Sequence, residues 1–266
     1  QAFVEWNIDG WKRVSDDTRR FRKALILVAR KNGKSTWMAG RSIKQSLADG
    51  EAGAQTFIGA TKLDQAKIIF DETERMVRYS PFIYRKAKLL KNNISFSDSG
   101  SYIRPLGSDK PFDGLNPHLA VFDELHAWQE YHRKFYDTMT TGSGARSQPL
   151  IYIVTTAADE SGLIYHEEVN YCRQILNGTV QNDSLFCVLY ELDPTDDPFD
   201  EAVWIKANPN LGISLRIEYL REQAAEAKAK PQALNRFLRY HCNRNVSSIE
   251  SGFTPNLLAI SFRVSP

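Results

Sequence analysis

The sequence predicts an α/β protein with a mostly parallel β-sheet, and three features support this fold class. Short apolar, β-branched runs alternate with amphipathic stretches of helical length, a basic turn follows the first run, and an acidic pair ends the third. Such alternation is typical of parallel strands joined by crossover helices. With 266 residues, 42% of them hydrophobic, the chain is long enough to bury a substantial core.

Five strands and four intervening helices are expected in the first 190 residues. The strands are predicted at residues 24–29, 56–60, 118–122, 150–155 and 185–190, and the helices at residues 34–47, 63–79, 131–141 and 163–176. Residues 93–106 differ, because two alternating runs flank Asp98-Ser99-Gly100. We expect a hairpin there, inserted into the α/β core.

The pattern changes after residue 190. Residues 191–245 are acidic and interrupted by prolines, and they contain two further helical patterns at residues 215–230 and 232–243. We therefore expect a core of residues 1–190 that carries a small helical lid of residues 191–245. Residues 246–266 have weak periodicity and are left unassigned.

The charge distribution limits the possible partners. The formal net charge is only +2, which excludes a polycation that coats nucleic acid, so any DNA contact must be local. Residues 1–48 nevertheless hold eleven Lys and Arg against four Asp and Glu, a balance suited to phosphate. The three cysteines form no C-x-x-C pair and no apolar run reaches the roughly 20 residues of a membrane span, so we expect a cytoplasmic protein.

The basic turn lies in "ALILVARKNGKSTWMAG", residues 24–40. A phosphate loop needs backbone N–H groups that follow a strand, the amino end of a helix, and a Lys, and Gly33-Lys34-Ser35 stands at that junction. The usual pattern has glycine where this chain has Val28, so the loop is a variant. Lys34 is expected to reach the β- and γ-phosphates and Ser35 to hold Mg²⁺. The alternative is a plain helix start with Ser35 on the surface. The residues predicted to bind nucleotide here are Arg30, Lys31, Asn32, Gly33, Lys34, Ser35 and Thr36.

The acidic pair ends the strand in "HLAVFDELHAW", where Asp123 and Glu124 follow an apolar run. Two adjacent carboxylates at the end of a buried strand are unfavourable unless a cation balances them, and Mg²⁺ with ATP is the natural partner. Asp123 is expected to bind the metal through water, and Glu124 to activate the attacking water. The alternative is that the pair only caps the next helix. Together with the basic turn, it predicts a Mg²⁺-dependent ATP hydrolase of the P-loop, RecA/ASCE-like type.

Small polar side chains end the next strand, in "PLIYIVTTAADE". Thr155 and Thr156, followed by Ala157, should face the same crevice, because ligands bind beyond the carboxyl ends of parallel strands. They are candidates for sensing the γ-phosphate, and the alternative is an ordinary Thr-rich turn. His118 and His126 bracket the acidic strand, but neither has a second His or Cys at ligand spacing, so we interpret both as structural.

These motifs together resemble one family, the large terminase subunit of tailed double-stranded DNA bacteriophages. The resemblance extends over residues 6–245 and rests on the order and spacing of "VARKNGKS", "FDGLNP" before "HLAVFDELHAW", "GARSQPLIYIVTTA", "WIKANPNLG" and "LNRFLRYHCNRN". It implies an ATPase motor that drives double-stranded DNA into a procapsid through a portal protein. The motor would be a homo-oligomeric ring that works with a small terminase subunit, with no membrane involved.

The resemblance also implies roles for single residues. Lys34 and Ser35 belong to the nucleotide loop, Asp123 binds Mg²⁺, Glu124 is the catalytic carboxylate, and Thr155–Ala157 form the coupling motif. The acidic helical region resembles the lid of the family. Such ring motors complete each site with an arginine from the neighbouring subunit.

Arg146, in the loop "SGARSQP", is the candidate for that arginine, and the alternative is a solvated loop residue. The basic run at residues 19–23 is a candidate for binding DNA phosphates, or equally a solvated surface.

The chain stops before the nuclease domain that large terminases carry, so we expect that domain to be absent and expect no DNA cleavage. Two other functions stay open: a helicase-like remodelling ATPase, and an inactive remnant that binds nucleotide or DNA.

Overall fold

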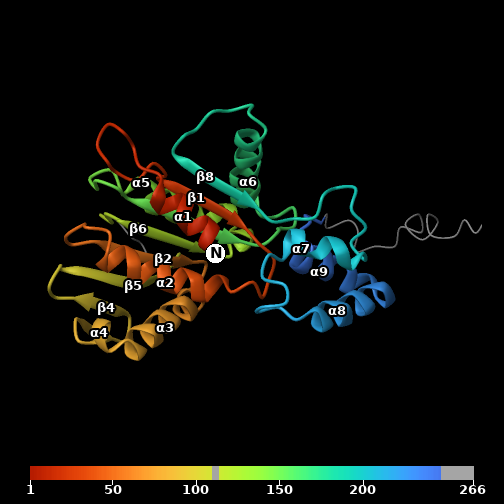
Figure 1. The fold of residues 1–266 in the computed structure, drawn as a ribbon, viewed down its shortest axis with the longest axis horizontal. Helices are drawn as coiled ribbons and strands as arrows, with labels where there is room; N and C mark the ends of the chain where they lie inside the picture. The colour runs from red at the N-terminus through yellow and green to blue at the C-terminus, as the bar shows by residue number, and fades with distance from the viewer. Residues whose placement is uncertain (110–113, 247–266) are drawn as a thin grey trace, which may run out of the picture.

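A single eight-stranded sheet organises the chain, in the order β3-β4-β5-β2-β6-β7-β1-β8 (Figure 1). The computed structural model describes residues 1–109 and 114–246. The strands are β1 Lys23–Leu27, β2 Gln55–Ala60, β3 Ala87–Leu90, β4 Asn93–Phe96, β5 Ser101–Gly107, β6 Leu119–Asp123, β7 Leu150–Thr155 and β8 Leu185–Leu189. Strands β5, β2, β6, β7, β1 and β8 are parallel, as predicted, and β3 and β4 are antiparallel.

The predicted hairpin at residues 93–106 is present, but it is not an insertion. Its second strand, β5, pairs in parallel with β2, with Gln55 opposite Tyr102 and Ala60 opposite Gly107. Its first strand, β4, pairs with β3, which we did not predict. The hairpin therefore extends the main sheet, and β3 becomes the edge strand.

Helices cover both faces of the sheet. The helices that pack on the sheet are α1 Ala2–Gly10, α2 Lys34–Leu47, α3 Leu63–Tyr79, α5 Arg133–Thr141 and α6 Leu163–Leu176. The other helices are α4 Pro81–Tyr84, α7 Trp204–Ala207, α8 Ile217–Ala229 and α9 Pro231–His241, with short 3₁₀ turns η1 Leu125–Ala127, η2 Glu130–His132 and η3 Glu201–Val203. The predicted strands and helices are confirmed to within two residues at each end. Helices α1, α4 and α7 were not predicted.

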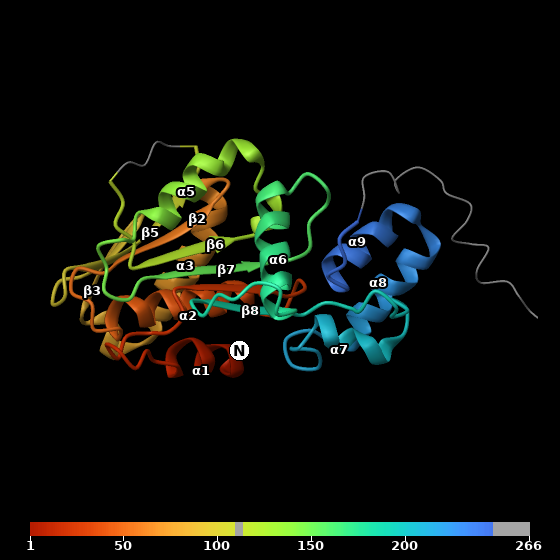
Figure 2. The ribbon, with the colours of Figure 1, turned by 90° about the horizontal axis from the view of Figure 1, so that it is seen from above.

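The two faces of the sheet form two separate hydrophobic clusters, because successive strand residues point to opposite sides. Ala24 and Ile26 of β1 pack with α1, α2 and α3, whereas Leu25 and Leu27 pack with α5 and α6 (Figure 2). Both faces are therefore buried, as the continuous apolar strands predicted. The carboxyl ends of the parallel strands stay free for a site at the edge of this core.

A third cluster forms in the helical segment, residues 191–246, around Trp204 and Phe237. The segment holds α7, α8 and α9, and Figure 1 shows it beside the carboxyl ends of the central strands. Within the described ranges, no helix is both long and apolar enough to cross a bilayer. The tail that we left unassigned lies outside the described residues from residue 247 onward.

Candidate functional site

The phosphate-loop candidate runs from the end of β1 to the start of α2. Lys31 and Gly33 have positive φ angles of 69° and 75°, which turn the chain sharply into the helix. Gly33 is the N-cap of α2, so the loop ends at the positive end of a 14-residue helix. This geometry suits an anion, although Val28 replaces the usual first glycine.

Lys34 lies inside the site rather than on the surface. Its side chain is nearly buried, at 7% exposed, and Nζ donates hydrogen bonds to the carbonyl oxygens of Val28 and Ala29, each at 3.3 Å. Burial lowers the pKa of this amine, while the charges of Glu124 and Asp123 oppose that shift. The basic turn follows β1 and the acidic pair ends β6, and both strands pair in parallel with β7, so Lys34 lies close enough to Asp123 and Glu124 for their charges to interact.

The acidic pair sits where β6 ends. Asp123 is the last strand residue and is buried, and Glu124 follows with a left-handed φ of 50°, a conformation that costs free energy for a residue with a side chain. Burial, and then the charge of Glu124, raise the pKa of Asp123 to about 7, and Lys34 only partly offsets this. Two carboxylates therefore share one lysine.

Two carboxylates next to a single lysine leave excess negative charge, which a bound Mg²⁺ would neutralise. Oε2 of Glu124 is buried and makes no well-aligned hydrogen bond within the described part of the chain. Ser35 lies half-buried in the first turn of α2, beside Lys34. A hard divalent cation prefers carboxylate and hydroxyl oxygens, so the donor set of Ser35 and Asp123 fits Mg²⁺.

His126 connects Glu124 to the strand β7. Its Nδ1 lies 3.0 Å from Oε2 of Glu124 and 3.0 Å from Oγ1 of Thr156, and its backbone N–H donates to Oγ1 of Thr155 at 3.1 Å. Burial lowers the pKa of His126 to about 4, so the ring is neutral near pH 7. The hydroxyls of Thr155 and Thr156, which we expected to face the same crevice as Glu124, contact His126 beside that carboxylate, and their contact with the γ-phosphate stays a prediction. The position of His126, two residues after Glu124, was the available signal.

The helical segment holds the phosphate loop from outside. Asn32 donates to Oδ1 of Asn208 at 3.0 Å and accepts from the backbone N–H of Asn210 at 3.1 Å. Ser214 donates to the carbonyl of Lys31 at 2.9 Å. The side chain of Asn32 is thus committed to protein contacts, and the motif "ANPNLGIS" serves as a clamp on the loop.

A second set of contacts comes from the end of α9. The guanidinium of Arg30 lies 3.5 Å from the centre of the Tyr240 ring, and the Arg30 N–H donates to the Tyr240 carbonyl at 2.9 Å. Oδ1 of Asn243 accepts from the N–H of Ala157 at 2.9 Å, and Arg239 donates to the Ala157 carbonyl at 3.1 Å. The helical segment therefore touches both the loop and the strand end after Thr156. These contacts were not predicted.

The structure does not bring Arg146 to this site. It precedes β7, at the amino ends of the strands, and its side chain is only 9% exposed. The guanidinium donates to the carbonyls of Asn116 and Gly53, at 3.1 and 2.9 Å, and pairs with Glu51 at 3.3 Å. A guanidinium with these bonds is not free to reach a neighbouring subunit, so it is neither a solvated loop residue nor a good arginine finger.

Two other predicted contacts also differ. The hydroxyl of Thr36 donates to Glu72 of α3 at 3.4 Å, away from the loop. All four basic residues at 19–23 have partners, which are Asp49 for Arg19, Asp183 for Arg20, the Ser147 carbonyl for Arg22 and Glu168 for Lys23. That run is therefore a poor candidate for DNA.

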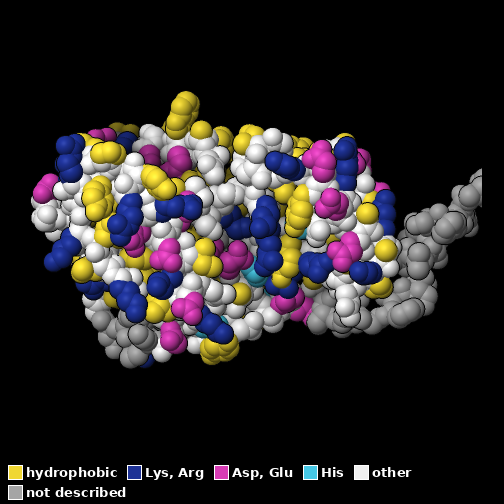
Figure 3. Space-filling view, turned by 90° about the horizontal axis from the view of Figure 1, so that it is seen from below, with side chains coloured by type: hydrophobic (Ala, Val, Ile, Leu, Met, Phe, Trp, Pro, Cys, Tyr) yellow, Lys and Arg dark blue, Asp and Glu magenta, His cyan; other side chains and the backbone are white. Residues whose placement is uncertain are grey.

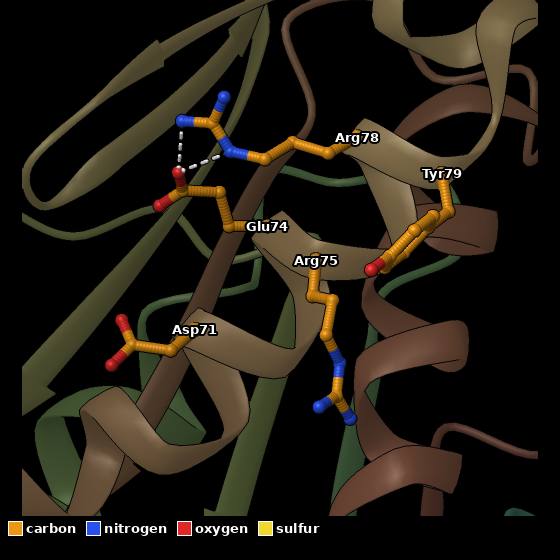
Figure 4. A pocket seen from close by; sticks show the side chains of 5 residues that line it. All are labelled: Asp71, Glu74, Arg75, Arg78 and Tyr79. Carbon is orange, nitrogen blue, oxygen red and sulfur yellow. Dashed lines mark hydrogen bonds and ion pairs between the residues drawn. The ribbon is translucent and has the colours of Figure 1, made fainter.

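Two surface hollows among the described residues are lined by side chains other than the acidic pair. One lies along α3 and is lined by Asp71, Glu74, Arg75, Arg78 and Tyr79 (Figure 4). In it, Arg78 bonds to Glu74 one turn earlier. Across the described ranges, no three or more His, Cys, Asp or Glu side chains group as a metal site.

Comparison with known proteins identifies the family. The model described as "Terminase large subunit, ATPase domain" matches residues 1–174. The chain belongs to the terminase large subunit family. The model for the terminase endonuclease domain matches residues 179–254, so the expected absence of nuclease sequence is not confirmed. Part of that match, β8, belongs to the ATPase-side sheet.

Curated relatives agree with this assignment. The chain is 40% identical to protein YmfN of Escherichia coli (strain K12) over 131 residues, covering 49% of this chain and 28% of that protein. It is 28% identical to the terminase large subunit of Enterobacteria phage HK97 over 242 residues, covering 89% of this chain and 47% of that protein. The chain thus spans less than half the length of these relatives.

Solved structures share the fold. The HK97 bacteriophage large terminase superimposes with a TM-score of 0.76 at 24% identity, covering 85% of this chain and 47% of that chain. The large terminase of a thermophilic bacteriophage, in complex with ATP-gamma-S, gives a TM-score of 0.57 at 13% identity, covering 90% of this chain and 51% of that chain. The P-loop α/β fold predicted from the sequence is confirmed.

Proposed function

We propose that this chain is the ATPase motor part of a phage or prophage large terminase, which hydrolyses ATP to move double-stranded DNA into a procapsid. The observation that carries the proposal is that buried Lys34, after β1, and buried Asp123, at the end of β6, lie at the same edge of a sheet in which both strands pair in parallel with β7, with Glu124 next to Asp123. A cation and two under-compensated carboxylates at a helix amino end suit a magnesium-bound triphosphate. The helicase-like alternative is not favoured by the family match.

The position of each residue in the site supports a separate role in ATP hydrolysis. The N–H groups at the start of α2 and the ammonium of Lys34 would bind the phosphates, and Ser35 and Asp123 would hold Mg²⁺. Bound Mg²⁺ would neutralise charge on the phosphate oxygens. Glu124 would orient a water and accept its proton, and the ring of His126 lies between this carboxylate and Thr156. Arg30 and Lys31, within the loop, would supply further positive charge.

The partners follow from the family and stay proposals, because the chain covers less than half of its curated relatives. We propose a homo-oligomeric ring in the bacterial host cytoplasm that acts on double-stranded DNA with a portal protein and a small terminase subunit. An arginine supplied in trans would complete each site. The contacts of Arg146 leave that arginine unassigned.

Nucleotide binding and phosphate release by single variants test the site. Glu124→Gln should keep ATP affinity within about threefold while lowering turnover by about a hundredfold or more, because it removes a general base. Lys34→Ala should weaken ATP binding by about tenfold or more, because a charge-assisted bond is lost. Glu222→Gln, an exposed carboxylate on α8, is the matched control and should leave both unchanged. Normal turnover in Glu124→Gln or normal binding in Lys34→Ala would refute the assignment.

A further inference from the structure

A strongly basic stretch lies at the sheet edge away from β8 and the helical segment. Residues 75–97 contain six Lys and Arg and no Asp or Glu, although the net charge of the chain is only +2. The six cations are Arg75, Arg78, Arg85, Lys86, Lys88 and Lys91. This stretch therefore has a strong positive charge, whereas positive and negative charges nearly balance over the whole chain.

These cations are on the surface of one contiguous part of the fold. They come from the last turns of α3, from the turn after α4, and from β3 and the residue that follows it, and all six are exposed. Figure 3, which views the side where α3 and α4 lie in Figure 1, shows Lys and Arg interleaved with hydrophobic side chains at this end. We call residues 75–91 the α3–β3 surface.

Half of the cations in the α3–β3 surface lack an acidic partner. Arg75 and Arg78 pair with Glu72 and Glu74 on their own helix, and Lys86 lies 3.8 Å from Asp98. For the remaining three, no carboxylate of the described chain lies within ion-pair distance, and these are Arg85, Lys88 and Lys91. By contrast, all four cations of the run at residues 19–23 are occupied.

Exposed aromatic rings accompany the unpaired charges. Tyr79, Phe82 and Tyr84 are 83%, 64% and 48% exposed, and the Lys86 ammonium lies 5.0 Å from the centre of the Phe82 ring. Exposed apolar side chains that gather on one part of a surface are typical of a binding site. A nucleic-acid backbone offers phosphates to the cations and sugar faces to the rings.

A purely protective role explains only part of the pattern. β3 is an edge strand, and lysine on an edge prevents pairing with another chain. That reason covers Lys88, which lies within β3. It does not cover Arg85 or Lys91, which lie outside the strand, or the exposed rings.

We infer that the α3–β3 surface binds the phosphate backbone of duplex DNA, with Arg85, Lys88 and Lys91 as the principal contacts. The inference rests on the proposed motor function for its partner, but it uses residues outside the nucleotide site. It predicts binding without base specificity, because phosphate contacts carry no sequence information.

The test compares two triple charge reversals in the 266-residue chain by the anisotropy of a labelled DNA duplex between about 50 and 200 mM salt. Arg85→Glu, Lys88→Glu, Lys91→Glu should lower affinity about a hundredfold or more near 0.1 M salt and reduce the salt slope by about 2 to 3, since each lost phosphate contact removes about 0.9. Lys12→Glu, Lys134→Glu, Arg216→Glu changes three exposed cations elsewhere and alters net charge equally. It should lower affinity less than about threefold.

Each other outcome overturns the inference. Equal losses in both triple variants would mean that net charge alone drives binding. Unchanged DNA binding with self-association of the first variant would mean that the cations only protect the β3 edge. If the first variant loses more affinity for a single strand than for a duplex of equal length, the surface binds single-stranded DNA by base stacking on the rings and not the duplex backbone. ATP turnover, measured in parallel, should be unchanged in both variants, because the substituted residues lie outside the nucleotide site. If the unaltered chain binds DNA through this surface but does not hydrolyse ATP, the motor proposal is wrong and the inference about the α3–β3 surface still holds.

Discussion

The two ends of the parallel sheet use the same kinds of side chain in opposite ways. At the amino ends, Asp49 is held by Arg19 and His118, and burial, which would raise its pKa, is outweighed by these hydrogen bonds, so its pKa falls. At the carboxyl ends, Asp123 faces another carboxylate and its pKa rises to about 7. A paired buried charge indicates architecture, whereas an under-compensated one indicates a place for a ligand.

The largest expected effect comes from breaking the paired end. Asp49→Ala should lower the free energy of unfolding by about 3–5 kcal/mol, because it leaves Arg19 buried with one fewer carboxylate. Denaturant unfolding measures this loss. Asp183→Ala, which removes an exposed partner of Arg20, is the control and should cost less than about 1 kcal/mol. Similar losses in the two variants would erase the distinction between the ends.

The second effect tests the pKa shift of Asp123, which is opposite in sign to that of Asp49. Its folded pKa of about 7 lies above the ordinary 3.8, so this carboxyl contributes stability that is complete below pH 3.8 and is lost as pH rises to about 7. Asp123→Asn removes that loss. Without nucleotide or Mg²⁺, the variant should gain about 2–4 kcal/mol on the wild type between pH 4 and 8. A stability difference that does not change with pH would show that Asp123 is already well paired.

The smallest effect concerns the link through His126. His126→Ala should leave ATP affinity unchanged and lower turnover about tenfold to a hundredfold, because it removes the ring whose Nδ1 lies 3.0 Å from both Glu124 Oε2 and Thr156 Oγ1 and so frees the carboxylate to move. His132→Ala removes another buried histidine, at η2, and serves as the control for stability. If both variants keep full turnover after correction for folding, His126 has only a packing role.

Local patterns predicted most of the fold. Apolar runs and helical periodicity located the central strands, because these signals come from burial on two faces. They missed β3, a four-residue edge strand with only partly buried side chains, and α1, whose polar contacts to α2 leave a weak pattern. The hairpin was found, but its place in the sheet depends on long-range pairing with β2.

The site divides along the same line. The placement of Lys34 and the acidic pair at one edge of the sheet could be predicted, because each follows an apolar run that reads as a parallel strand, whereas their roles stay predictions. The contacts of Arg146 could not be predicted, because a loop with Gly and Ser neighbours is usually exposed. In the structure, Glu51, 95 positions away, accepts a hydrogen bond from its guanidinium. The clamp on Asn32 by Asn208 joins residues 176 positions apart and leaves no local trace.

That clamp has a mechanical consequence. Because Asn32 and Lys31 are bonded to residues 208–214 and Arg30 rests on Tyr240, any change in loop shape must displace the helical segment or break these contacts. Thermodynamic reciprocity then requires the reverse: a pulling load applied to that segment would alter how tightly the loop binds an anion. Under the proposed motor function, tension on the DNA would in this way set the rate of nucleotide exchange.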